Sequence, residues 1–412
     1  MKSKVSPGKN HKTARCAILL DDFSAEAGGK FSFQNMVVSQ MIRQYNIDEI
    51  DLEIFLITKS TVFKAKNPEF NLVKFGLRSS LYCISTLQKF QFMFRSFRGG
   101  NSSPPTRESL RINLLLKFFN VDFVLAIHQL RAPLAVPFGT VIFDLAHIDT
   151  PWLPEIRSGE EWNRRENENR EVSQRSSFIV TGATEHKVKL VTRWGLDSSN
   201  VKVLPFPIHK CSCGEEVKLA PREKNLVVYP AQYWPHKNHL TFVNAVSMVH
   251  RNFPDIRVIF LGGSHGGMWA KVKEHIQRLA LAESIEMMGF VPQTSLFKIY
   301  HQANALLFPS LIGPDNLPPL EAIAHGVPRI AISDLPGARN LYNNSFDYFN
   351  PYDANSLAFM LSSFMEFREG SSSQIVARRE LQKAHTIENY CSHLFQEMEI
   401  LRLESRLEKG GF

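Results

Sequence analysis

Two stretches decide the fold of this chain: PSLIGPDNLPPLEA at Pro309 to Ala322, and YPAQYWPHKNH at Tyr229 to His239. Each follows a short apolar run that is typical of a buried strand, and each opens into a segment with helical periodicity. A helix N-terminus carries unpaired backbone N–H groups and a partial positive charge, so it suits an anion. Two such strand-to-helix turns in one parallel-sheet domain predict a site for a nucleotide diphosphate.

Strand-like and helix-like segments alternate along the whole chain. Apolar, β-branched runs predict buried strands at 16–20, 52–58, 123–127, 140–143, 178–181, 201–204, 226–229, 257–261, 285–288, 305–308 and 329–332. Amphipathic segments predict helices at 33–45, 162–175, 237–253, 269–282, 295–302, 317–325 and 354–367. This alternation is typical of doubly wound α/β domains with parallel sheets.

A polar segment at 210–225 divides the two α/β series. We therefore predict an N-terminal Rossmann-like domain at 1–207 and a C-terminal Rossmann-like domain at 208–384. The last segment, 374–409, has a helical period, and its apolar positions suit either a coiled-coil arm or one helix packed across the domain junction. We expect a helix at about 385–412 to complete the first domain.

Composition agrees with a two-domain globular protein. The chain has 412 residues, too many for one ordinary core. Its net charge of +8 favours an anionic partner: a nucleotide sugar, a polyanionic acceptor, an acidic membrane surface or a nucleic acid. No recognisable nucleic-acid-binding module accompanies the charge, so we expect no nucleic-acid partner.

The cysteines and the N-terminus indicate a reducing compartment. The five cysteines lack the spacing of a zinc site and are expected to be reduced. No apolar segment with a cleavage site follows the basic N-terminus, and no apolar run is long enough to span a membrane. We therefore expect a cytoplasmic protein, with peripheral contact to the inner face of the membrane as a further expectation.

That membrane contact would come from a stretch at 81–119 in which Phe residues interleave with Lys and Arg. Such a basic aromatic stretch suits a membrane surface or a lipid-linked acceptor. Two ordinary helices joined by a surface loop explain the same pattern. The sequence leaves both interpretations open.

Three groups of residues could carry chemistry in the second domain and in the first strand-to-helix turn. Gly28 and Gly29 follow the first strand, where a glycine pair lets backbone approach a ligand, although a plain turn needs them equally. Lys237 at a helix start opposes the helix dipole unless an anion is bound there. Glu321 can accept hydrogen bonds from a ribose diol or stabilise its helix.

Residues that flank these groups have two interpretations each. Asp315 and Asn316 precede a helix, so they either cap it or meet sugar hydroxyls. Asp144 and His147 end a strand of the first domain, where they could assist catalysis or form a loop cap. The chain contains no D-x-D triplet, so we expect no metal ion and no cofactor besides a nucleotide-sugar co-substrate.

The chain resembles the retaining glycosyltransferases of family 4, which have the GT-B fold of two Rossmann-like domains facing across a cleft. The resemblance rests on several motifs taken together: DDFSAEAGGK, FDLAH, WNRRE, YPAQYWPHKNH, FLGG, MMGFVP and FPSLIGPDNLPPLEAIAHGVP. It covers nearly the whole chain and is strongest in the second domain.

The resemblance implies donor binding by the second domain and acceptor binding by the first. Lys237, with Asn238 beside it, would hold the diphosphate, and Glu321 would hold the ribose as the second Glu of an E-x7-E motif. The backbone from Asn316 through Leu317 and Pro318 to Pro319 would face the phosphates and the sugar. The base would lie near Phe290 and Val291, and Gly28 and Gly29 would approach from the first domain.

Two positions depart from the family pattern. The first Glu of E-x7-E falls on Gly313, and the Arg that usually accompanies the lysine falls on Gln232. We interpret the site as a variant donor site.

The expected function is a retaining, hexosyltransferase-like glycosyltransferase that moves a sugar from a nucleotide diphosphate donor to a glycan or a lipid-linked acceptor. The pathway would be polysaccharide or cell-surface glycan biosynthesis. Two alternatives stay open: a non-catalytic nucleotide-sugar-binding scaffold of a glycan-assembly complex, and a GT-B nucleotide-sugar epimerase or hydrolase.

Overall fold

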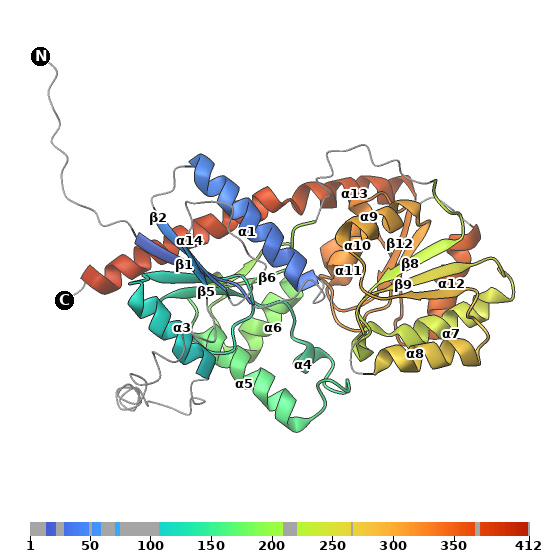
Figure 1. Cartoon of the computed structure of the whole chain (residues 1–412), viewed down its shortest axis with the longest axis horizontal. Coiled ribbons are helices and arrows are strands. Elements are labelled where there is room, and N and C mark those ends of the chain that lie inside the picture. Colours follow the sequence, from blue (N-terminus) through green and yellow to red (C-terminus); the bar gives the residue numbers. More distant parts are fainter. Residues whose placement is uncertain are drawn as a thin grey trace, which may run out of the picture.

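The structure, a computed structural model, describes residues 14–21, 29–48, 52–58, 71–74, 107–208, 221–264, 267–366 and 371–410. Two α/β domains lie side by side, and each has a parallel sheet between layers of helices (Figure 1). Gly28 and positions 81–106 of the basic aromatic stretch lie outside the described residues.

The first domain is built on a seven-stranded sheet of order β3-β2-β1-β4-β5-β6-β7. Its strands are β1 (Ala14–Leu19), β2 (Leu52–Thr58), β3 (Asn71–Lys74), β4 (Phe123–Ala126), β5 (Phe138–Val141), β6 (Phe178–Thr181) and β7 (Val201–Val203). Its helices are α1 (Gly29–Asp48), α3 (Arg107–Phe118), α4 (Ala146–Asp149), α5 (Gly159–Arg175) and α6 (Thr184–Trp194). All its strand pairs are parallel.

The second domain has a six-stranded parallel sheet of order β10-β9-β8-β11-β12-β13. Its strands are β8 (Leu226–Pro230), β9 (Arg257–Leu261), β10 (Ile285–Met288), β11 (Ala305–Phe308), β12 (Arg329–Ser333) and β13 (Asp347–Phe349). Its helices are α7 (His239–His250), α8 (Met268–Arg278), α9 (Gln293–Gln302), α10 (Leu317–Ala324), α11 (Ala338–Tyr342), α12 (Ala354–Glu366) and α13 (Ser372–Ala384).

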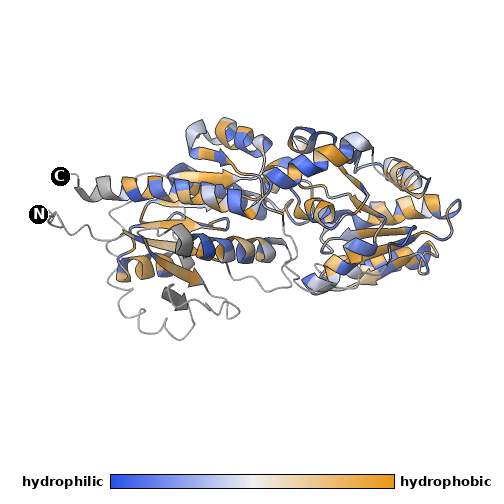
Figure 2. Cartoon of the chain, turned by 90° about the horizontal axis from the view of Figure 1, so that it is seen from above, coloured by the Kyte–Doolittle hydropathy of each residue, from blue (hydrophilic) through white to orange (hydrophobic). Residues whose placement is uncertain are grey.

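The predicted α/β architecture is confirmed, and most predicted strands lie where the apolar runs are. The strands are buried on both faces because helices cover both sides of each sheet, and Figure 2 shows them as mostly hydrophobic ribbons. The prediction missed β3 and β13 and placed β5 two residues too late. Short strands at a sheet edge carry too few apolar residues to give a distinct period.

The C-terminal segment is not one helix as the periodicity predicted. It is two helices, α13 and α14 (Ile387–Gly410). The helical conformation is interrupted at Thr386. Its Oγ1 accepts a hydrogen bond from the N–H of Asn389 (3.2 Å) and so caps α14. The apolar face of α14, Tyr390 to Leu401, joins the core of the first domain, and Figure 1 shows the helix lying along it. The coiled-coil interpretation is therefore wrong.

Helix α3 shows what the described end of the basic aromatic stretch does. Leu116 is buried, and Ile112, Leu115 and Phe119 pack against the same core as β2 and β4. Phe118, by contrast, is 77% exposed. Within residues 107–119 the apolar side chains thus serve mainly the interior of the first domain. No helix in the described part of the chain is long and apolar enough to cross a membrane.

Candidate functional site

The strand orders place the site. In each sheet the order reverses next to the first strand, between β1 and β4 in one domain and between β8 and β11 in the other. Doubly wound sheets bind ligands at the carboxyl ends of the strands at such a reversal. The loops after β8 and β11 carry Lys237 and Asn316, so the structure brings the two quoted stretches together at this crevice.

Lys237 lies in the loop after β8, at the carboxyl end of the second-domain sheet. It ends a 3-10 turn, Pro235–Lys237, and does not start a helix, because α7 begins only after Asn238 in the left-handed conformation (φ 60°). The Lys237 Nζ donates to Asn316 Oδ1 (3.2 Å) and Ser310 Oγ (3.4 Å), and it stands 5.2 Å from the centre of the Phe308 ring. Burial lowers the pKa of the ammonium from 10.5 to about 8, and the nearby Asp144 carboxylate opposes this shift.

The N-terminus of α10 has no side-chain cap. Asn316 occupies the N-cap position, but its side chain turns to Lys237 and to the carbonyl of Ile312 (2.8 Å), so the predicted capping role is not observed. Pro318 and Pro319 have no N–H to offer, and the N–H of Asn316 donates to the carbonyl of Pro314 (3.0 Å). The expected row of amides from Asn316 to Pro319 therefore reduces to the N–H of Leu317.

Glu321 is buried on the same helix, with a relative exposure of 7%. Its Oε2 accepts a hydrogen bond from the Tyr300 hydroxyl of α9 (3.1 Å). Burial raises the pKa of Glu321 from 4.5 to about 7, with the Tyr300 hydrogen bond acting the other way. A buried carboxylate with one fixed donor keeps lone pairs for further donors such as a vicinal diol.

Two glycines fix the backbone around Lys237. A Cβ on Gly262, in the FLGG motif, would lie 2.3 Å from the carbonyl oxygen of Ala231, and the φ of Gly262 is +156°. A Cβ on Gly313 would lie 2.7 Å from Nδ2 of Asn316. Any side chain at Gly313, including the family's Glu, would push against the residue that holds Lys237.

Asp315 faces the first domain. Its Oδ2 lies 3.7 Å from Nδ1 of His186, which also places Nε2 3.2 Å from the carbonyl oxygen of Gly313. Burial raises the pKa of Asp315. Asp315 therefore contributes to the contact between the domains and does not cap α10.

The first domain brings Gly29 and Asp144 to the crevice. A Cβ on Gly29 would lie 3.7 Å from Cδ1 of Leu317, so the start of α1 meets the start of α10. Asp144 Oδ1 accepts from the N–H of Ala146 (3.1 Å). Burial alone would raise the pKa of Asp144, but Lys30, that N–H and Arg165 together hold it below its usual range.

His147 does not face the crevice. The side chain is 1% exposed, and Nε2 lies 3.2 Å from Glu166 Oε2 within the first domain. Burial lowers the pKa of His147, with Glu166 opposing. The imidazole thus packs inside the first domain, and the catalytic role suggested for His147 stays a prediction.

The other predicted donor residues surround the crevice less closely. Gln232 Oε1 accepts from the indole N–H of Trp234 (3.1 Å), and Asn238 Nδ2 donates to the carbonyl of Pro351 (2.7 Å). Phe290 is exposed and Val291 half-buried at the end of β10.

Sequence reasoning missed three residues of the site. Ser310 lies two residues after the end of β11 and could have been found from its place beyond a strand end. Tyr300 and Glu155 could not, because nothing in the sequence links them to Glu321 or His236. Glu155 Oε1 lies 2.7 Å from His236 Nδ1 across the domain boundary.

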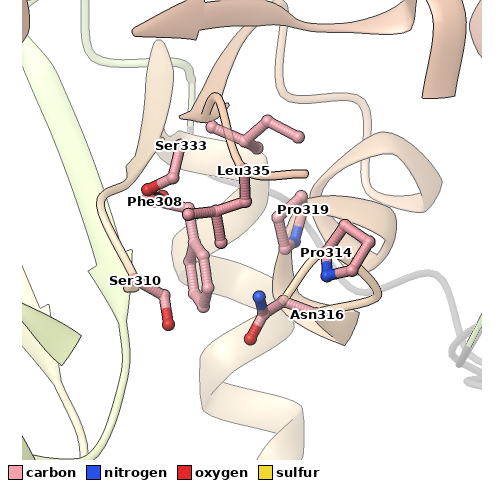
Figure 3. A pocket seen from close by; sticks show the side chains of 8 residues that line it. Phe308, Ser310, Pro314, Asn316, Pro319, Ser333 and Leu335 are labelled. Carbon is pink, nitrogen blue, oxygen red and sulfur yellow. Dashed lines mark hydrogen bonds between the residues drawn. The ribbon is translucent and has the colours of Figure 1, made fainter. Parts of the chain in front are cut away.

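A small hollow opens beside Lys237. It is lined by Phe308, Ser310, Pro314, Asn316, Pro319, Ile332, Ser333 and Leu335. Figure 3 shows the Phe308 ring between the side chains of Ser310 and Asn316, the two residues that accept from Lys237. The described residues contain no group of three or more His, Cys, Asp or Glu placed to hold a metal ion.

Comparison with known proteins follows the same division. Residues 215–379 match the family model of the group 1 glycosyl transferases. The O-antigen chain mannosyltransferase RfbU of Salmonella typhimurium is 24% identical over 183 residues, which are 44% of this chain. The match spans 49% of that relative's length, about half.

Two solved structures have the same fold over nearly the full length. Sucrose-phosphate synthase from Thermosynechococcus elongatus superposes with a TM-score of 0.68 at 15% identity, covering 95% of this chain and 100% of its own. HepE of Anabaena, solved with UDP and glucose, gives 0.61 at 13% identity, covering 94% and 99%. Residues 215–379 are therefore similar to the group 1 glycosyl transferases, and the chain as a whole has the two-domain GT-B fold.

Proposed function

We propose that the chain is a retaining glycosyltransferase. It moves a sugar from a nucleotide diphosphate donor to a glycan or a lipid-linked acceptor in polysaccharide or O-antigen-type glycan biosynthesis. The observation that carries this proposal is Lys237, which is held by Asn316 and Ser310 at the mouth of an uncapped helix in a domain of the glycosyl transferase family.

The second domain offers the parts of a donor site. The Lys237 ammonium supports the diphosphate, and the N–H of Leu317 points out of the first turn of α10 toward the same place. The Glu321 carboxylate, fixed by Tyr300, receives the ribose hydroxyls. Phe290 and Val291 at the end of β10 take the base. The choice of a nucleotide-sugar donor is supported by the similarity to RfbU, a mannosyltransferase, and to HepE, which was solved with UDP and glucose.

The reaction needs positioning and charge stabilisation more than a protein nucleophile. The bond between the anomeric carbon and the diphosphate oxygen breaks, and Lys237 stabilises the charge that develops on that oxygen. The acceptor hydroxyl attacks from the face that the diphosphate leaves, and its proton passes to the leaving oxygen. Asp144 lies at the first-domain side of the crevice, where it orients the acceptor or the sugar. No metal ion takes part in this scheme.

The test has two steps. UDP, GDP, ADP and TDP sugars are first screened by thermal shift, since a ligand that prefers the folded protein raises the unfolding temperature. The stabilising donor is then incubated with lipid-linked and glycan acceptors, and the anomeric configuration of the product is read by NMR. Transfer with retained configuration is expected.

The alternatives give other products. Binding without transfer to any acceptor indicates a scaffold, for which Gly313 in place of Glu is the favouring observation. Conversion of the donor in the absence of acceptor indicates an epimerase or a hydrolase. A product with inverted anomeric configuration contradicts the retaining mechanism but not the glycosyltransferase activity.

Peripheral membrane contact is a separate proposal that rests on residues 81–119 and on the net charge of +8. Co-sedimentation with anionic vesicles tests it, with neutral vesicles as the control. Binding to the anionic vesicles that disappears in high salt is expected.

A further inference from the structure

We propose that Lys30, at the start of α1 in the first domain, is a second cation of the diphosphate site and closes it from the side opposite Lys237. The inference rests on the proposed function and assigns a further binding residue to it. It follows from the small number of positive groups that the second domain provides and from the position of Lys30 beside the start of α10.

The second domain is short of donors for a diphosphate. Pro318 and Pro319 remove two amides from the first turn of α10, and Asn316 commits its own N–H to Pro314. Gln232, at the end of β8, carries no charge. Lys237 therefore provides one ammonium group at the N-terminus of α10. A diphosphate carries more than one negative charge.

Lys30 stands close to this mouth. Its neighbour Gly29 lies against Leu317, the first residue of α10. A Cβ on Gly29 would be 3.7 Å from Cδ1 of Leu317. Leu317 follows Asn316, which holds the Lys237 ammonium at 3.2 Å. Figure 1 shows one end of α1 at the junction between the domains. The starts of α1 and α10 thus face each other with one lysine beside each.

The Lys30 ammonium also has a defined direction. Its Nζ lies 5.6 Å from the centre of the Phe143 ring, next in sequence to Asp144. The Asp144 carboxylate interacts electrostatically with the ammonium groups of both Lys30 and Lys237. This carboxylate offsets the charge of the two lysines, and a diphosphate bound between them would offset the same charge.

Residue Lys30 is exposed, so its substitution does not threaten folding. Lys30→Met removes the charge and keeps much of the aliphatic stem. Lys30→Arg keeps the charge. Lys383→Met is the matched control, because Lys383 is a lysine on α13 whose side chain is 73% exposed and pairs with Glu380 in the same helix. Asp144→Asn removes the opposing carboxylate.

The experiment is isothermal titration of these variants with the nucleoside diphosphate that stabilises the wild type, with the corresponding nucleoside and with inorganic pyrophosphate. Lys30→Met is expected to weaken the diphosphate and pyrophosphate about tenfold or more, as for loss of one charge-assisted contact. It leaves nucleoside affinity unchanged. Lys30→Arg stays within about threefold of wild type, and Asp144→Asn binds the diphosphate as tightly as wild type or more tightly.

Two results overturn the inference. One is equal diphosphate affinity in Lys30→Met and wild type. The other is a loss in Asp144→Asn as large as that in Lys30→Met, which shows that Lys30 acts only by holding Asp144. Either leaves the proposed function intact as long as the wild type binds the donor; a wild type that binds none of the nucleotides removes both proposals together.

Discussion

The two walls of the crevice are built differently. On the second-domain wall, Lys237 and Glu321 each hold a fixed hydrogen-bond partner before any ligand arrives. On the first-domain wall, Lys30 is exposed, and the Asp144 side chain is 29% exposed and accepts one hydrogen bond, from the N–H of Ala146 (3.1 Å). The difference shows that the polar groups of the second-domain wall are fixed by internal hydrogen bonds, whereas Lys30 on the first-domain wall stays exposed.

The largest expected effect is that of Lys237→Met on the preorganised wall. The variant should lower kcat on the order of 10²–10³-fold, because one donor to the developing oxyanion is lost. Steady-state kinetics with the identified donor measure this, and circular dichroism checks that the variant folds. Turnover equal to the parent would remove Lys237 from its role and erase the contrast between the two walls.

Glu321→Gln tests whether preorganisation costs stability. The pKa of Glu321 is raised from 4.5 to about 7 in the fold, so the folded state keeps a proton that the unfolded state releases. Stability from this group is present below pH 4.5 and is lost as the pH rises through about 7. Glu321→Gln should therefore be more stable than wild type at pH 8 by about 3 kcal/mol, with little difference at pH 4.

Urea unfolding of both proteins at the two pH values measures the difference. Glu53→Gln, at a half-exposed carboxylate of β2, is the matched control. The same offset at pH 4 and pH 8 would show that proton uptake by Glu321 is not its source.

Donor binding should also depend on pH through Lys237. Its pKa is lowered to about 8, so the ammonium is present below that pH and is lost above it. Donor affinity is expected to fall by up to about tenfold per pH unit above pH 8. Lys237→Arg should bind the donor with a flatter profile, since a guanidinium stays charged. Parallel profiles for the two proteins between pH 7 and 9.5 would assign the titration elsewhere.

The smallest effect on donor binding is expected for His147→Gln in the interior of the first domain. The imidazole faces Glu166 inside the first domain, so the variant should change the donor Kd by less than about twofold while it loses roughly 1–3 kcal/mol of stability. Calorimetric titration and urea unfolding give the two quantities. A kcat that drops about a hundredfold at unchanged donor Kd would restore the catalytic role that the sequence suggested for His147.

The sequence predicted the fold well because its strands are buried on both faces and read as continuous apolar runs. It located the loop of Lys237 and the start of the helix that carries Glu321, because turn residues and strand ends mark them. It failed where a contact joins distant segments: Tyr300 to Glu321, Glu155 to His236, and His147 turned to Glu166. Such pairs depend on how helices pack, and no local pattern of residue types records that packing.

The chain crosses between the domains twice, and the two crossings touch. The N–H of Ile208 donates to the carbonyl of His385 (2.8 Å), and Nδ1 of His385 lies 2.8 Å from the carbonyl oxygen of Phe206. These two contacts join the crossing segments to each other, so the domains are held together at this place. Because α14 follows the second crossing, truncation of the chain after Ala384 would remove a core helix from the first domain. It would also remove one of the two covalent connections between the domains.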